Sequence, residues 1–171
     1  MPLSPTPAQA SPAPLLPGAI LYRAGDPTGL WTIDDGAIRL DFEHEGAEHF
    51  IHLAVPGDRL GLESVDAASH RLTARAVTVC RVRPLANPPA PKDPALLSDA
   101  LAWQQRKCIE LVRLRSGTLA DRLRHLLSMI APPSATDDPD RSHCPIPSLK
   151  DIAAIVGAAP ESVSRTLGEL R

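Results

Sequence analysis

Cysteine is scarce in this sequence of 171 residues, and its spacing excludes two kinds of site. Cys80, Cys108 and Cys144 are odd in number and lie far apart, so they indicate neither a disulfide framework nor a CxxC metal motif. Cysteine used in this way fits a reducing compartment. We therefore expect the protein to reside in the cytoplasm.

Long apolar runs are missing as well. The sequence has no run of eighteen apolar residues and no N-terminal basic region followed by an apolar stretch, so it predicts neither a membrane span nor a signal peptide. The sequence also lacks a nucleophile elbow, a Walker loop, an HExxH motif and a paired-carboxylate pattern. We therefore expect no enzyme and no membrane partner.

The sequence has no overall excess of basic residues. Its 18 Lys and Arg stand against 20 Asp and Glu, which gives a net charge of −2 and a pI of about 6.3. This balance excludes the global basic character typical of nonspecific nucleic-acid binding, so any DNA contact must come from a local patch. Between residues 101 and 130, basic residues outnumber acidic ones: Arg106, Lys107, Arg113, Arg115, Arg122 and Arg124 against Glu110 and Asp121.

The C-terminal segment 148–171 is predicted to form two short helices joined by a glycine turn. Ser148, with Asp151 three residues later, is typical of a capping box at the start of the first helix. Gly157 supplies a permissive turn residue, and Pro160 suits the first position of the second helix. We expect these side chains to face inward: Ile152, Ala153, Val156, Ala158 and Val163. The pattern is that of a helix-turn-helix.

The run DIAAIVGAAPESVSRTLGEL closely resembles the C-terminal helix-turn-helix of the Crp/Fnr transcription regulators, and the upstream segments resemble that family in the same order. The recognition helix of the Fnr branch carries Glu, then Ser and Arg, so the resemblance implies that Glu161, Ser164 and Arg165 contact bases. Ser162 on the same helix is a further DNA-binding candidate. Arg pairs with guanine, Glu accepts from cytosine, and Ser serves either. Spacings of three and four residues put the triplet on one helix face.

The resemblance implies a sequence-specific transcription regulator that binds a palindrome as a homodimer, with half-sites similar to TTGAT. Its implied partners are double-stranded DNA and a second copy of the chain, with RNA polymerase as a further candidate. Family members continue past the recognition helix into a β-hairpin wing, whereas this sequence ends at Arg171. One alternative stays open, namely a ligand-binding or protein-interaction module whose helix-turn-helix does not bind DNA specifically.

The expected fold class is α+β, with an N-terminal antiparallel β-barrel or jelly roll of the cyclic-nucleotide-binding-like kind. Residues 1–17 contain six prolines and predict a disordered arm. Residues 18–93 are expected to form the sensor barrel, with strands in AILY, LWTI, GAIRLDF, AEHFIHLA and RLTARAVTVCRV. Along the third of these we expect Arg39 and Asp41 in water and Ile38, Leu40 and Phe42 buried.

The effector of this barrel is left unknown. Family members that bind cyclic AMP hold its phosphate with a Gly-Glu pair and a later Arg-Ser or Arg-Thr, but here GLE at 61–63 and RLT at 71–73 interrupt both pairs. We expect Arg71 on a strand surface instead. A cysteine-ligated iron–sulfur cluster is not expected, because the N-terminal arm has no cysteines. Haem stays open, with four candidate ligands: His44, His49, His52 and His70.

Residues 94–116 are predicted to form a long helix after a proline-rich linker. A stripe at spacings of four and three is typical of a coiled-coil seam: Leu97, Leu101, Gln104, Cys108 and Leu111. The resemblance implies that this is the dimerisation helix, which sets two recognition helices one DNA turn apart. The alternative, that the stripe packs on its own barrel, stays open. Gly117 predicts a break before the DNA-binding domain 117–171, whose first helix, 118–130, turns these residues inward: Leu119, Leu123, Leu126, Leu127 and Ile130.

Overall fold

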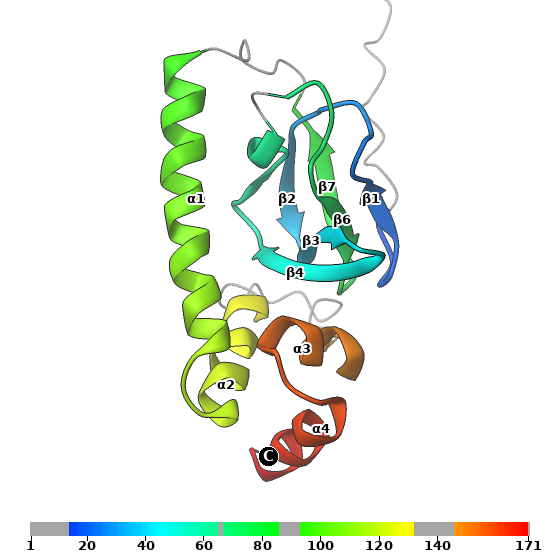
Figure 1. Ribbon diagram of the computed structural model, residues 1–171, viewed down its shortest axis with the longest axis vertical. Helices are drawn as coiled ribbons and strands as arrows, with labels where there is room; N and C mark the ends of the chain where they lie inside the picture. The colour runs from blue at the N-terminus through cyan, green and yellow to red at the C-terminus, as the bar shows by residue number, and fades with distance from the viewer. Residues whose placement is uncertain (1–13, 65–66, 86–92, 132–145, 171) are drawn as a thin grey trace, which may run out of the picture.

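The computed structural model describes residues 14–64, 67–85, 93–131 and 146–170 (Figure 1). The predicted N-terminal arm lies outside these residues except for its last four. The strands are β1 (Ile20–Tyr22), β2 (Trp31–Asp35), β3 (Ile38–His44), β4 (Ala47–Ala54), β5 (Arg59–Leu60), β6 (Thr73–Ala76) and β7 (Arg81–Pro84). The helices are α1 (Pro94–Arg115), α2 (Leu119–Ile130), α3 (Leu149–Val156) and α4 (Pro160–Glu169), with a short 3₁₀ helix at Leu62–Ser64.

The strands form a sandwich of two antiparallel sheets rather than a closed barrel. One sheet has the order β1-β6-β3-β4 and the other the order β5-β2-β7. The segment RLTARAVTVCRV, predicted as one strand, divides between the sheets, because residues 77–80 carry the chain from β6 in the first to β7 in the second. Arg71, expected on a strand, is exposed but lies on a bend before β6. Between the sheets lies an apolar core that includes Tyr22, Ile33, Ile38, Leu40, Leu60 and Ala74.

The alternation predicted for β3 was wrong at three positions. Arg39 and Asp41, expected in water, are 5% and 1% exposed, whereas Phe42, expected inside, is 44% exposed. The register between β3 and β4 shifts at Leu40/Asp41, and the outer face of the sheet at Arg39 is covered by α3, whose Asp151 pairs with the guanidinium. Strand alternation predicts which residues share a face, but only the neighbouring element decides whether that face is wet.

The helices bury a second core against the outer face of this sheet. We call it the junction core; it consists of Ala37, Phe50, Leu53, Val77, Leu114, Leu123, Leu126, Ile152, Ala153, Ile155, Val156 and Val163. Figure 1 shows α1 running alongside the sandwich and α2, α3 and α4 gathered at its lower end. Gly117, with φ of 84°, separates α1 from α2 as predicted. Thr118 then caps α2 by accepting a hydrogen bond from the N–H of Asp121.

The helix pair α3–α4 has the local structure that its sequence predicts. Ser148 accepts a hydrogen bond from the N–H of Asp151 at the start of α3, and Pro160 lies in the first turn of α4. Gly157 ends α3 in the left-handed conformation, with φ of 64° and ψ of 53°. A glycine satisfies this geometry at little cost, because a Cβ there clashes with the backbone. The turn therefore fixes the direction in which α4 leaves α3.

We expect Gly157→Ala to lower the free energy of unfolding by about 1–2 kcal/mol, the usual cost of left-handed backbone in an L-residue. The new Cβ would also lie 2.3 Å from an Arg115 guanidinium nitrogen, so that side chain must move. Urea unfolding measures the effect. Gly168→Ala, in α4 and with no heavy atom within 4 Å of its Cβ, is the matched control and should be neutral or stabilising. Equal destabilisation by both changes would contradict this account of the turn.

Candidate nucleic-acid interface and sensor core

The predicted base-contacting residues lie together on the outer side of α4. Glu161, Ser164 and Arg165 are exposed, and Ser162 is half-buried. Val163, between them in sequence, is fully buried in the junction core and holds the helix in place. The structure thus presents one face with a carboxylate, a hydroxyl and a guanidinium, which can donate to and accept from hydrogen-bonding groups of a partner.

Two arginines hold the turn from which α4 starts. Arg115, at the end of α1, donates through its Nη2 to the carbonyl of Ala154 at 2.8 Å, and Arg122 of α2 donates through its Nη1 to the carbonyl of Val156 at 2.6 Å. The last carbonyls of a helix have no partner within the helix, and cations there also complement its dipole. The two guanidinium groups therefore bond to the last turn of α3.

This placement corrects the predicted basic patch at residues 101–130. Besides these two arginines, Lys107 is buried and pairs with Asp58 at 2.6 Å and Glu110 at 2.8 Å, and Arg124 pairs with Asp121 at 2.9 Å. Four of the six basic residues thus pair within the chain, three of them with a helix end or with carboxylates around a buried ammonium. Only part of the surplus of basic residues is therefore left without a partner of this kind.

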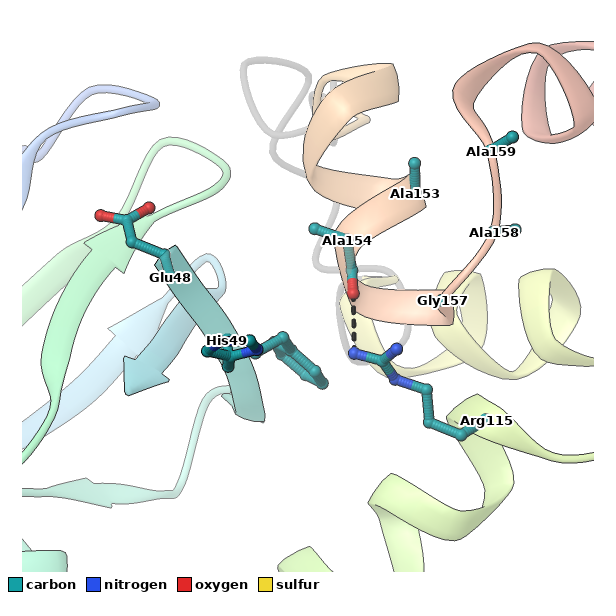
Figure 2. A pocket seen from close by; sticks show the side chains of 9 residues that line it. Glu48, His49, Arg115, Ala153, Ala154, Gly157, Ala158 and Ala159 are labelled. Atoms are coloured by element: carbon teal, nitrogen blue, oxygen red, sulfur yellow. Dashed lines mark hydrogen bonds between the residues drawn. The ribbon is translucent and has the colours of Figure 1, made fainter. Parts of the chain in front are cut away.

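An open cleft of about 490 Å³ lies between the sheet and the helix pair (Figure 2). Residues 48–50 of β4 form one wall, and residues 153–154 and 157–159 of the helix pair form the other. Figure 2 shows the Arg115 side chain reaching the Ala154 carbonyl across this space. The central carbon of the Arg115 guanidinium, Cζ, lies 5.5 Å from the centre of the Phe50 ring, which is a cation–π distance. Arg115 therefore contacts the sheet and α3 from the end of α1.

Helix α1 carries two faces. Its buried face packs on the protein through Leu96, Trp103, Lys107 and Leu114. Most of the predicted coiled-coil stripe points elsewhere: Leu97 and Leu101 are 42% and 63% exposed, and Gln104 and Cys108 are exposed too. Packing on its own barrel is therefore the wrong interpretation for these four, whereas Leu111 packs partly against the junction core.

The sequence analysis missed two apolar side chains of α1, Val112 and Ile109, which are 61% and 56% exposed. Val112 follows Cys108 by four residues and so extends the stripe along the helix. Counting onward from the predicted stripe at helical spacing would have found it.

The space between the sheets near β1 is filled by the protein's own side chains. Glu63 accepts hydrogen bonds from the Tyr22 hydroxyl at 2.8 Å and from the Gly61 N–H at 3.0 Å. The His70 ring stacks on Tyr22 with centroids 3.7 Å apart, and its Nδ1 lies 3.5 Å from the Glu63 carboxylate. Burial raises the pKa of Tyr22 far above its usual range. Burial also acts to raise the pKa of Glu63, but the contacts with His70 and Tyr22 lower it overall.

The four candidate histidines lie in different surroundings in the described part of the chain. His70 accepts the Gly29 N–H at its Nε2, and its other nitrogen faces Glu63. His44 and His49 are exposed on the β3–β4 hairpin. His52 is buried under α1, edge-on to Trp103 at 4.8 Å. No group of three or more His, Cys, Asp or Glu able to hold a metal occurs among the residues described.

The protein thus combines a two-sheet sandwich, a long helix with an exposed apolar stripe, and a C-terminal helix pair with a polar outer face. No family model matches the chain. No helix in the described ranges is long and apolar enough to cross a membrane.

The chain is similar to known transcriptional regulators. The transcriptional regulator LdrP of Thermus thermophilus is 29% identical over 157 residues, which is 89% of this chain and 80% of LdrP. The fold matches TTHB099, a CRP-family transcriptional regulator of the same species, with TM-score 0.67 and 24% identity over 93% of this chain and 84% of that one. It also matches the CRP/FNR-family regulator TTHA1359 of that species, with TM-score 0.57 and 25% identity over 92% and 84%. These similarities support the resemblance to Crp/Fnr regulators that the sequence predicts.

The buried His52 should make stability depend on pH. Burial lowers the pKa of His52 to about 4, whereas an unfolded histidine titrates near 6.5. Below pH 6.5 the unfolded state therefore binds the proton more readily than the folded state does. The contribution of His52 to stability is complete above about pH 6.5 and is lost as the pH falls toward 4.

We expect wild type to lose about 2 kcal/mol more than His52→Gln between pH 7.5 and pH 5, measured by urea unfolding. His44→Gln, which changes an exposed ring, should keep the wild-type dependence on pH. If His52→Gln showed the same dependence as wild type, His52 would not be held neutral by burial.

Proposed function

We propose that this chain is a sequence-specific DNA-binding transcription regulator that reads DNA with α4 and works as a homodimer. One observation carries the proposal: α4 exposes Glu161, Ser164 and Arg165 on one face while Val163 anchors it from behind. An exposed helix with a buried anchor is what insertion into a major groove requires. The relatives, which are transcription regulators by name, support the same function.

The exposed groups suit base edges rather than phosphates alone. Arg165 can donate two hydrogen bonds to guanine O6 and N7, and Glu161 can accept from cytosine N4. The triplet is that of the Fnr branch, so we propose a palindrome with half-sites similar to TTGAT. Because the arginines of α1 and α2 mostly bond within the chain, the affinity must depend heavily on α4 itself.

The homodimer follows from α1. Leu97, Leu101 and Val112 leave a large apolar surface in water along one helix, and a second copy of the same helix can cover it. A parallel pair of α1 helices would place two copies of α4 to read two half-sites. We further propose that the sandwich senses a signal and passes it on by changing how α1 packs, which requires the signal to bind two states with different affinity.

We expect Arg165→Ala to cost about 1–3 kcal/mol in binding to the palindrome, because a bidentate contact with guanine is lost. Fluorescence anisotropy with the palindrome, and with a duplex in which the contacted G·C pair is replaced, measures the loss and its specificity. The variant should no longer distinguish the two duplexes.

Arg124→Ala is the matched control, because Arg124 is equally exposed in a neighbouring helix but pairs with Asp121. It should leave the preference for the palindrome unchanged. If wild type bound the palindrome no more tightly than a scrambled duplex, the chain would instead be a ligand-binding or protein-interaction module.

We expect Leu101→Glu to raise the dimer dissociation constant by roughly tenfold or more, because the interface would then bury carboxylates in place of leucines. Sedimentation equilibrium across a range of concentrations measures the constant. Leu149→Glu is the control: Leu149 is 44% exposed but belongs to α3 and not to the stripe of α1. A change of equal size in both variants, or a wild type that is monomeric at every concentration, would refute a dimer built on α1.

A further inference from the structure

A partly buried ion pair links the helix pair to the sheet β1-β6-β3-β4, which we call the sensor sheet. Nη1 of Arg39, on β3, lies 3.0 Å from Oδ1 of Asp151, in the first turn of α3. The Arg39 side chain is 7% exposed and that of Asp151 is 21% exposed. The two residues are 112 positions apart in the sequence, so the contact is purely tertiary. It joins the element that would sense a signal to the element that would read DNA.

Each member of this pair has a second partner within its own half of the molecule. Arg39 also donates through Nε and Nη2 to Oδ1 of Asp41, at 2.9 and 2.6 Å. Asp151 also accepts a hydrogen bond from the Ser148 hydroxyl at 2.6 Å, as part of the N-cap of α3. If the helix pair separates from the sheet, Arg39 keeps Asp41 as a partner and Asp151 keeps Ser148.

The sensor sheet contains a hydrogen-bond acceptor that Arg39 could use after release of Asp151. The buried Oδ2 of Asp41 has no hydrogen-bond partner among the described residues. After release of Asp151, a small rotation of the Arg39 side chain would give a two-pronged pair with both oxygens of Asp41, the favoured geometry for Arg and carboxylate. Buried ion pairs are costly to break mainly because one charge is stranded, and this arrangement avoids that cost.

The sandwich contributes few side chains to the apolar packing next to this ion pair. Only Ala37, Phe50, Leu53 and Val77 represent the sandwich in the junction core, whose other members lie on helices. Next to them is the open cleft between β4 and the turn of the helix pair. The core of α2, α3 and α4 can therefore persist when the sheet moves away from it.

We propose that Arg39 and Asp151 form an exchangeable latch that holds the helix pair on the sensor sheet and opens without stranding a buried charge. The latch couples the orientation of α4 to the sheet, and its role in DNA binding rests on the function proposed above. The existence of the latch does not rest on that function, because the docking of the helix pair on the sheet can be measured without DNA.

Asp151→Asn is the variant of choice. Ser148 still caps α3 by accepting the backbone N–H of residue 151, and the asparagine oxygen can still accept the Ser148 hydroxyl. The Arg39–Asp41 pair also stays intact, so only the charge of the latch is removed. Asp121→Asn is a closely matched control. Asp121 occupies the same position in α2, where the Thr118 hydroxyl donates to its Oδ2 at 2.6 Å and its N–H donates to Thr118 at 3.2 Å. Its charged partner, Arg124, is exposed on the same helix.

Hydrogen–deuterium exchange of the full chain tests the latch. We expect amides of α3 and of the facing β3 and β4 to exchange roughly fivefold faster or more in Asp151→Asn, because an interaction needed only for docking is weakened. Amides of β2 and β7, in the other sheet, should keep their rates. Asp121→Asn should leave the rates in β3 and β4 unchanged.

Two results would overturn the latch. One is that the amides of α3, β3 and β4 exchange at the same rates in Asp151→Asn as in the wild type. The other is the same acceleration in both variants, since that would reflect weaker capping and not lost docking. Either result leaves the DNA-binding proposal standing, because that proposal is decided by Arg165→Ala. Conversely, loss of DNA recognition alone would not contradict faster exchange.

Discussion

The position of α1 on the sandwich depends on Asp58, in the turn between β4 and β5. Its two carboxylate oxygens receive the Lys107 ammonium at 2.6 Å, the Trp103 indole N–H at 3.1 Å and the backbone N–H of Val55 at 2.9 Å. Two of these donors come from α1, one helical turn apart, so they fix its rotation as well as its distance. Removing one member of such a buried pair typically costs about 3–5 kcal/mol.

This single rotation decides what the rest of α1 can do. With Trp103 and Lys107 turned to the sandwich, the stripe that begins at Leu97 and Leu101 must face water. The same rotation brings Leu114 into the junction core and Arg115 over Phe50 and the last turn of α3. The helix therefore links the β4–β5 turn of the sandwich to the base of the helix pair and leaves an apolar stripe exposed.

Several charged side chains form bonds between elements of the chain. Arg39, Lys107, Arg115 and Arg122 each satisfy a carboxylate or a helix carbonyl at a boundary between elements. Glu63 is likewise turned inward to Tyr22 and His70. Buried polar groups are stable only with such partners. These boundaries between elements therefore depend on matched polar partners.

The sequence by itself determined the features that depend on neighbours three or four residues away. The capping of α3 by Ser148, the left-handed turn at Gly157, the break at Gly117 and the common face of Glu161, Ser164 and Arg165 all follow from local geometry. Most strands and all four helices lie close to where their patterns predicted them, because hydrophobic periodicity and turn residues are local signals too.

Only the tertiary structure decided which polar side chains are buried and what they bind. Arg39 and Asp41 look like solvent-facing strand residues until α3 covers them, and Lys107 looks like part of a basic patch until Asp58 lies beneath it. The division of one predicted strand between two sheets and the cluster of Tyr22, Glu63 and His70 have the same origin. These partners are tens of residues apart in the chain, and no local pattern specifies which distant surfaces will meet, because that depends on how whole elements pack.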